Sequence, residues 1–352
     1  MIEITDKRDP NTFRTVTFSG YKKTEVKKQL HTNIMHGKVE QSLYWCAELI
    51  CGGQYIEIWD TILTLAGKHI HYGNPKLPIY LEKRFEDFKS IIEGGFAGYE
   101  IKMRNSDKIR KLFAEIMCIL CFSQKKHSFD SIKIDKDEFD ITQISYKLRA
   151  DSLAYITPIF MSEDPKECFI AGNELAYCVT EKGRNSNEAC YWIEWISEFE
   201  SICARKKTKC VCERRSSMPV DGRYQTELVW FMWDILLHET SKRDQLTRKI
   251  MKSLLTLFCL RYTSASKKKR RFILYTAVYM LTEKINALIP ICTKNDMIHK
   301  IVQNLDPIYK ELKKNEVKPE TDYMYHGVKQ SSLEKTIAKL ETMNNIGFIP
   351  RG

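Results

Sequence analysis

Apolar residues recur at helical spacing along most of this chain, and this periodicity restricts its fold more than any other feature. Val26, Leu30 and Ile34 share one face of a predicted helix, and Gly37 follows at the position of a left-handed stop. The alternation of apolar and polar residues that is typical of half-buried strands is nearly missing, and we expect one short strand at residues 132–134. The pattern predicts an all-α protein.

Short turns rich in glycine, proline or asparagine separate the predicted helices. The helices are expected at residues 24–35, 39–51, 55–70, 80–92, 109–122, 166–180, 186–204, 224–238, 243–262, 267–287 and 296–314, with a further helix at 332–343. Because short turns leave consecutive helices side by side, we expect packed helical hairpins. The segment 109–122 is almost entirely apolar, so it should lie near the centre of the first core.

A length of 352 residues suits two consecutive domains better than one. The helical pattern is interrupted by an acidic, hydroxyl-rich stretch at about 123–140, which indicates a connection between two halves. The predicted organisation is an N-terminal helical domain at 1–128, a linker at 129–142, a basic C-terminal helical domain at 143–314 and a polar tail at 315–352.

An internal similarity links the two predicted halves. Tyr44-Trp45 and Tyr191-Trp192 lie 147 residues apart, and each pair follows a predicted helix and a turn that contains glycine and a cation. A divergent duplication explains this arrangement. Two aromatic amphipathic helices that match by chance explain it equally well.

Cysteine usage and hydropathy bear on the cellular compartment. Several of the 12 cysteines stand inside apolar helical segments, where thiols act as small buried hydrophobic groups: Cys46, Cys51, Cys118, Cys121 and Cys259. This distribution predicts reduced thiols in an intracellular compartment. No apolar segment approaches the ~20 residues that cross a bilayer, and the N-terminus is polar and charged, so we expect neither secretion nor membrane insertion.

Positive charge is concentrated in one part of the sequence. Residues 201–275 contain 18 Lys and Arg against 6 Asp and Glu, a net charge of +12, whereas the whole chain carries +11. Localised charge of this kind indicates a polyanionic partner, because each phosphate that a cation neutralises releases a counterion.

The candidate nucleic-acid-binding residues come from three basic clusters. They are Arg205, Lys206, Lys207, Lys209, Lys242, Arg243, Lys267, Lys268, Lys269, Arg270 and Arg271. Five successive cations at 267–271 lie at the predicted N-terminus of a helix, where the positive end of the helix dipole repels them. This unfavourable placement argues against a purely structural reason for the cluster. We expect the three clusters to share one exposed face, although a nuclear targeting signal or a solvated helix start would also account for residues 267–271.

Recognisable catalytic motifs are missing from the sequence. It contains neither a phosphate-binding Gly-x-x-x-x-Gly-Lys-Ser/Thr loop nor an arrangement that indicates a catalytic triad, so we predict a non-enzymatic protein without a cofactor. Cys203, Cys210 and Cys212, with His238 as a fourth ligand, could bind zinc. Because the paired Cys-x-x-Cys arrangement of zinc sites is missing, we expect unliganded cysteines and no metal.

Two resemblances supply a biological context. The segment 38–81, with Ser42-Leu43-Tyr44-Trp45-x-Ala47, Gly52-Gly53, Ile62-x-x-x-Ala66 and Asn74-Pro75-x-Leu77, resembles the helical collar domain of MgsA/WRNIP-type replication-associated AAA+ ATPases. This resemblance implies self-assembly. The segments 1–23 and 173–177 resemble uncharacterised helical proteins of nucleocytoplasmic large DNA viruses, which implies a location in infected-cell cytoplasm or in the virion.

The positive charge and the two resemblances together predict a nucleic-acid-associated accessory protein of a large DNA virus that acts in replication or genome packaging. We expect protein partners or self-assembly, and no association with a membrane. The alternative is a virion structural protein, such as a minor capsid or core component. An enzyme of unrecognised type is the third hypothesis.

Overall fold

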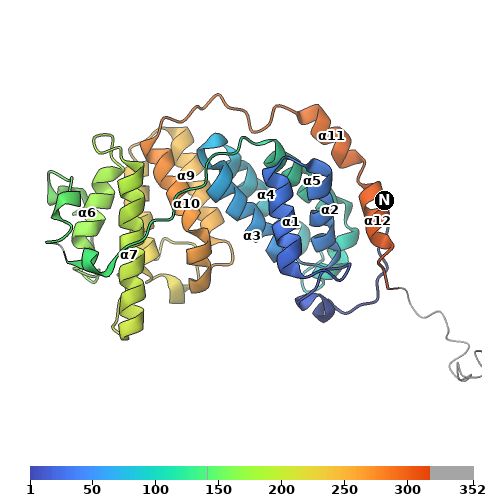
Figure 1. The fold of residues 1–352 in the computed structure, drawn as a ribbon, viewed down its shortest axis with the longest axis horizontal. Helices are drawn as coiled ribbons and strands as arrows, with labels where there is room; N and C mark the ends of the chain where they lie inside the picture. Colours follow the sequence, from blue (N-terminus) through green and yellow to red (C-terminus); the bar gives the residue numbers. More distant parts are fainter. Residues whose placement is uncertain (141, 318–352) are drawn as a thin grey trace, which may run out of the picture.

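The computed structural model describes residues 1–140 and 142–317, and the protein is all-α. Figure 1 shows two helical groups side by side along the longest axis of the molecule. The first five helices are α1 (Lys23–Met35), α2 (Val39–Cys51), α3 (Tyr55–Leu65), α4 (Leu77–Glu93) and α5 (Asp107–Phe122). The remaining helices are α6 (Cys168–Cys178), α7 (Ser186–Lys206), α8 (Leu228–Thr240), α9 (Gln245–Cys259), α10 (Ser264–Thr282), α11 (Asn295–Gln303) and α12 (Asp306–Lys313).

Local sequence signals account for several helix boundaries. The side chain of Ser106 accepts a hydrogen bond from the backbone N–H of Ile109 at the start of α5, and Asp107 places negative charge in the first turn. Gly37 and Gly53 have positive φ angles of 67° and 69° after α1 and α2, where glycine adopts the left-handed region without a steric penalty. The predicted helix at 39–51 is confirmed by α2.

Other predicted boundaries are wrong. The expected helix at 296–314 is two helices, because Asn304 ends α11 and Pro307 occupies the first turn of α12. The helix predicted at 55–70 ends as an α-helix at Leu65 and continues as a single π-helical turn. Residues 132–134 form no strand, and the described residues contain only an isolated bridge between Val16 and Lys22. The predicted helix at 332–343 lies outside the described residues.

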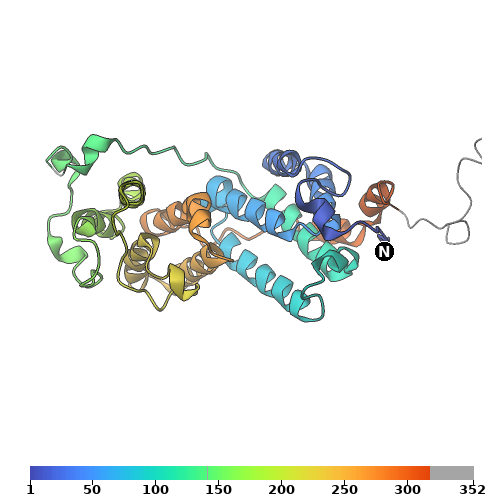
Figure 2. The ribbon, with the colours of Figure 1, turned by 90° about the horizontal axis from the view of Figure 1, so that it is seen from below.

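The chain crosses between the two helical groups twice. The segment that follows α5 runs from the first group to the far side of the second, and the segment after α10 returns to the first group (Figures 1 and 2). As a result α11 packs against α5 and α12 packs against α2. The burial of Ile298, Tyr309 and Leu312 explains this return, because each helix covers apolar surface of the first group.

The return of α11 and α12 differs from the predicted placement of residues 295–313 in the C-terminal domain. Contacts between α4 and α9 and between α3 and α10 join the two groups, and the buried apolar residues form one continuous cluster. Trp192, Trp230 and Trp233 are almost completely buried within it. Among the described helices, none is long and apolar enough to cross a membrane.

The internal duplication is not confirmed. The two segments that carry the Tyr-Trp pairs each form a pair of packed helices, α1 with α2 and α6 with α7. The connections differ in length, at residues 36–38 and 179–185, and so do the surroundings of the tryptophans. Trp45 is only half-buried and contacts Tyr21, whereas Trp192 is 1% exposed.

Candidate nucleic-acid interface

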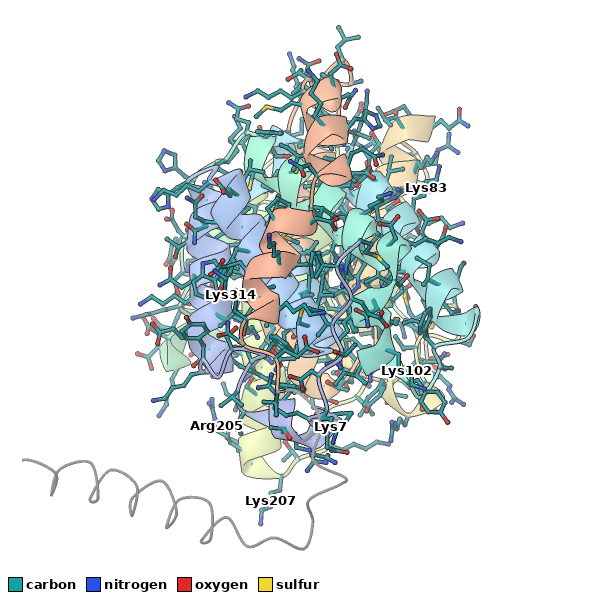
Figure 3. All side chains as sticks on the ribbon, turned by 90° about the vertical axis from the view of Figure 1, so that its right-hand side faces the viewer. Lys7, Lys83, Lys102, Arg205, Lys207 and Lys314 are labelled. Atoms are coloured by element: carbon teal, nitrogen blue, oxygen red, sulfur yellow. The ribbon has the colours of Figure 1, made fainter. Side chains whose placement is uncertain are left out.

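The cations at 205–209 occupy the projecting end of α7 and the turn that follows it. Figure 3 shows Arg205 and Lys207 at the lower edge of the molecule, whereas Lys83 lies near the upper edge. Arg205 forms an ion pair with Glu198 at 2.6 Å. The remaining cations of this cluster are exposed and have no ion pair with any residue that the structure describes: Lys206, Lys207 and Lys209. We call these three residues the α7 tip.

Lys242 and Arg243 lie at the opposite end of α7 from the α7 tip. Arg243 donates a hydrogen bond of 3.0 Å to the carbonyl oxygen of Val179, close to Asn185, which caps the start of α7. A helix of 21 residues is about 30 Å long, so α7 holds the two clusters far apart. The prediction of one shared basic face is therefore wrong for Lys242 and Arg243.

Acidic partners also neutralise this pair. Arg243 binds Glu181 at 2.8 Å and Glu239 at 3.0 Å, and its side chain is only 9% exposed. Lys242 binds Glu239 at 3.2 Å. Because the contacts of Arg243 join the ends of α6 and α8, the structure gives Arg243 a role in packing, whereas the side chain of Lys242 is 56% exposed.

The run at 267–271 is divided by the rotation of α10, since successive helical residues point about 100° apart. Lys267 contacts Glu200 at 2.5 Å and Glu227 at 3.2 Å, and Arg271 contacts Glu194 at 3.7 Å. These three acids lie outside the cluster in sequence but beside it in space. Lys267 and Arg271 are therefore largely neutralised within the fold.

Arg270 holds the end of α9. Its guanidinium donates hydrogen bonds to the carbonyl oxygens of Phe258, at 2.8 Å, and Leu260, and it lies 3.8 Å from Asp60. Burial lowers the pKa of Arg270 from its ordinary value, although the nearby negative charge of Asp60 opposes that shift. The two carbonyl groups are the unsatisfied acceptors that every helix leaves at its C-terminus.

The two remaining residues of the run, Lys268 and Lys269, are exposed and face different surroundings. Lys268 lines a small cavity beside α7 together with Glu194 and Glu198. Lys269 faces the first helical group, where it lines a groove between α1, α3 and α10. Only Lys269 and Arg270 of the eleven predicted residues reach this groove.

We call this feature the α1–α10 groove; its volume is about 410 Å³. Its lining residues are Lys27, Lys28, His31, Asp60, Thr61, Leu63, Thr64, Lys269, Arg270, Phe272 and Ile273. Four cations and one carboxylate thus face the same space. The ammonium group of Lys68 adds a further positive charge at the edge, 5.0 Å from the centre of the Phe272 ring.

Acidic neighbours neutralise only part of this charge. Lys27 forms an ion pair with Glu57, which also lies 3.7 Å from Lys23. Burial opposes ionisation of Glu57, but the hydrogen bond and charge of Lys27, with the charges of Lys23 and Lys269, lower its pKa. Within residues 1–140 and 142–317, no ion pair involves Lys28, Lys68 or Lys269.

Two partly buried histidines lie beside the cations of the groove. The rings of His31 and His69 lie 5.0 Å apart at the groove. Burial, assisted by the charge of Lys68, lowers the pKa of His31. Burial, together with His31 and Lys68, lowers the pKa of His69 to about 4. The smaller, Coulombic part of these shifts comes from Lys68, whose positive charge would also attract an anion.

Sequence reasoning missed the groove cations on α1. Lys22, Lys23, Lys27 and Lys28 stand close together with Glu25 as the only nearby acid, which was an available signal. This segment is short, whereas the positive charge at residues 201–275 extends over a much longer stretch, so net charge directed attention to the longer segment. Their importance follows from the packing of α1 near the start of α10.

The cysteine cluster does not form a metal site in the described part of the chain. No group of three or more His, Cys, Asp or Glu side chains there is arranged to hold a metal ion. Cys212 is buried and its thiol donates a hydrogen bond to the carbonyl oxygen of Glu227 at 3.2 Å. All twelve cysteines are unpaired thiols, and burial raises the pKa of Cys46, Cys118 and Cys259.

No known protein family, curated protein or solved structure matches this chain. The resemblances to the collar domain and to proteins of large DNA viruses therefore stay predictions.

Proposed function

We propose that the protein is a non-enzymatic nucleic-acid-binding protein whose α1–α10 groove contacts the phosphate backbone. The observation that carries this proposal is the convergence of Lys28, Lys68 and Lys269, none of them in an ion pair within the described chain, on one groove. They come from separate parts of the sequence. The charge of Lys68 contributes to the lowered pKa values of His31 and His69, although burial is the larger cause.

A phosphate backbone suits the cations of this groove. Contacts to the phosphate backbone require several neighbouring cations but no particular base, so such binding is independent of the nucleotide sequence. The hydroxyl groups of Thr61 and Thr64 on the wall donate to the backbone carbonyl oxygens of Glu57 and Asp60, so the groove's cations are the groups that would contact phosphate. An accessory role in replication or genome packaging of a large DNA virus, with self-assembly, is part of the proposal that rests on the resemblances.

A salt titration of binding to a fluorescently labelled oligonucleotide tests the proposal. The triple variant Lys28→Gln, Lys68→Gln, Lys269→Gln should lower the log-log salt slope by about 0.7 to 0.9 for each phosphate that the variant no longer neutralises. The melting temperature should change little, because Lys28 and Lys269 are exposed and none of the three residues forms an ion pair with a described residue.

The matched control removes three charges elsewhere, with Lys83→Gln, Lys102→Gln and Lys314→Gln, which lie outside the groove (Figure 3). It should retain most of the slope. Equal effects of the two triple variants would show non-specific dependence on net charge and would overturn the groove as the binding site. Absence of binding by the unmodified protein at low salt would overturn the function itself.

A further inference from the structure

A second cavity adjoins the α1–α10 groove and is lined mainly by apolar side chains. It has a volume of about 760 Å³ and lies between α3, α4 and the turn from α9 to α10. We call it the aromatic cleft; its apolar lining includes Tyr55, Ile56, Trp59, Phe85, Phe88 and Ile92. The cleft and the groove share Lys269 and Arg270, so one ligand can occupy both.

Both walls of the aromatic cleft are held by contacts within the protein. Trp59 packs edge-to-face on Phe85, with ring centres 5.1 Å apart, and contacts Phe88 at 5.9 Å. On the other side, Arg270 fixes the turn after α9 through the carbonyl oxygens of Phe258 and Leu260. The cleft is therefore preformed, and a ligand need not pay for its opening.

The mouth of the cleft exposes apolar surface. Ile56 is 52% exposed although it stands on α3 beside the buried Tyr55. Exposed apolar surface next to a concave, apolar cavity marks a place where a ligand is covered on several sides. The body of the ligand is thus apolar.

The rim of the same cleft is cationic. Arg261 and Lys269 lie on it without an ion pair among the described residues, and Lys89 pairs with Glu93 at 3.6 Å. Thr263 and Ala265 bring the N-terminal end of α10 to the rim, which carries partial positive charge. The complementary ligand has an apolar, flat or compact body and an anionic group.

We propose that the aromatic cleft binds one nucleotide unit, with its base against the partly exposed ring of Phe85 and its phosphate at Lys269. This inference rests on the proposed function, because Lys269 also faces the groove that holds the backbone. Base-to-aromatic contact tolerates any base, which agrees with sequence-independent binding. A base in a duplex is paired and stacked, so the cleft selects single strands.

The experiment compares four probes on the full chain by fluorescence anisotropy and competition. They are a labelled 20-nucleotide oligothymidylate, the same backbone without bases, a duplex of equal length, and free thymidine monophosphate as competitor. We expect the single strand to bind about tenfold more tightly than the abasic backbone, as the contribution of one stacked base requires.

Ala265→Trp provides the variant that fills the cleft, because Ala265 is exposed and lines it. It should abolish the preference for bases and leave the salt slope unchanged. Ala154→Trp adds the same side chain at an exposed position outside the cleft and the groove, and should change neither quantity.

The outcomes separate the inference from the proposed function. Equal binding of all three polymers, with no effect of Ala265→Trp, overturns the cleft as a base site and leaves the groove intact. Direct binding of thymidine monophosphate, measured by isothermal titration calorimetry, without binding of any polymer keeps the nucleotide site and overturns the proposed function. Dodecanoate, an anion with an acyl chain and no base, serves as a further competitor. If dodecanoate displaces the labelled oligothymidylate and thymidine monophosphate does not, the inference is overturned in favour of an acyl anion.

Discussion

The α7 tip and the start of α10 have similar sequences but opposite surroundings. The tip carries Lys206, Lys207 and Lys209 on a projecting helix end and the turn after it, where the described structure offers them no acidic partner. At the start of α10, residues 267–271 lie against α7, α9 and α3, and three of these five cations form ion pairs with acidic side chains of the same protein. Two segments with similar charge density in the sequence therefore produce different electrostatic potentials at the protein surface.

Helix α7 explains the difference between these two regions. Its residues Glu194 and Glu200 face α10 and neutralise Arg271 and Lys267, whereas its last turn extends beyond the neighbouring helices. A simultaneous replacement of residues 267–271 would therefore disturb packing as well as binding. This corrects the sequence-based expectation that these five side chains are all exposed.

The largest expected effect concerns Arg215, whose guanidinium group is paired with two carboxylates inside the protein. It is almost completely buried and binds Asp164 at 2.7 Å and Asp234 at 2.6 Å. Replacing Arg215 with Leu leaves two carboxylates without their partner, so the free energy of unfolding should fall by about 3–5 kcal/mol in urea denaturation. The exposed neighbour Arg214→Leu should stay within about 0.5 kcal/mol, and equal losses would contradict this contrast.

A smaller loss is expected at Arg270, which would test the structural role of the α10 run. Arg270→Ala removes charge-assisted hydrogen bonds to two carbonyl groups at the end of α9. The free energy of unfolding should decrease by about 2 kcal/mol. Lys268→Ala, two residues earlier and exposed, should change it by less than about 0.5 kcal/mol. Identical denaturation curves for the two variants would show that the run is uniformly exposed.

The buried histidines give the groove a pH dependence that the α7 tip lacks. His69 has a pKa of about 4 in the folded protein against 6.5 ordinarily, so the unfolded chain binds more protons between these values. Stability should therefore fall as the pH decreases from about 6.5 towards 4. Because His69 is only partly buried, solvent screening limits the loss to the order of 1 kcal/mol.

Urea denaturation at about pH 7 and pH 4.5 measures this dependence. His69→Gln should reduce the loss of stability at the lower pH. His299→Gln, at an exposed position of α11, should retain it. A stability difference that is unaffected by His69→Gln would remove this histidine as its source.

The smallest expected effect concerns binding at the α7 tip. The variant Lys206→Gln, Lys207→Gln, Lys209→Gln should lower the salt slope by no more than about 0.7 to 0.9, the value of a single neutralised phosphate. The reason is that the tip lies outside the lining of the α1–α10 groove. A decrease larger than that of the groove variant would move the binding site to the tip.

The sequence by itself determined the fold class and much of the core. Helical periodicity is a local property, so it predicted α2 and α5 closely and assigned tryptophans such as Trp230 and Trp233 to the interior. The turn glycines Gly37 and Gly53 were visible for the same reason, because a positive φ depends on the residue itself.

Only the tertiary structure decided which cations remain available. The acidic partners of Lys267 lie 40 and 67 residues away in sequence, those of Arg215 lie 19 and 51 residues away, and Glu181 lies 62 residues from Arg243. No local pattern predicts these pairs, in contrast to the i,i+4 pair of Arg243 with Glu239. The return of α11 and α12 to the first helical group and the meeting of α1 with α10 are equally non-local. Electrostatic energy depends on distance in space and on burial, and the chain sets both only when it packs.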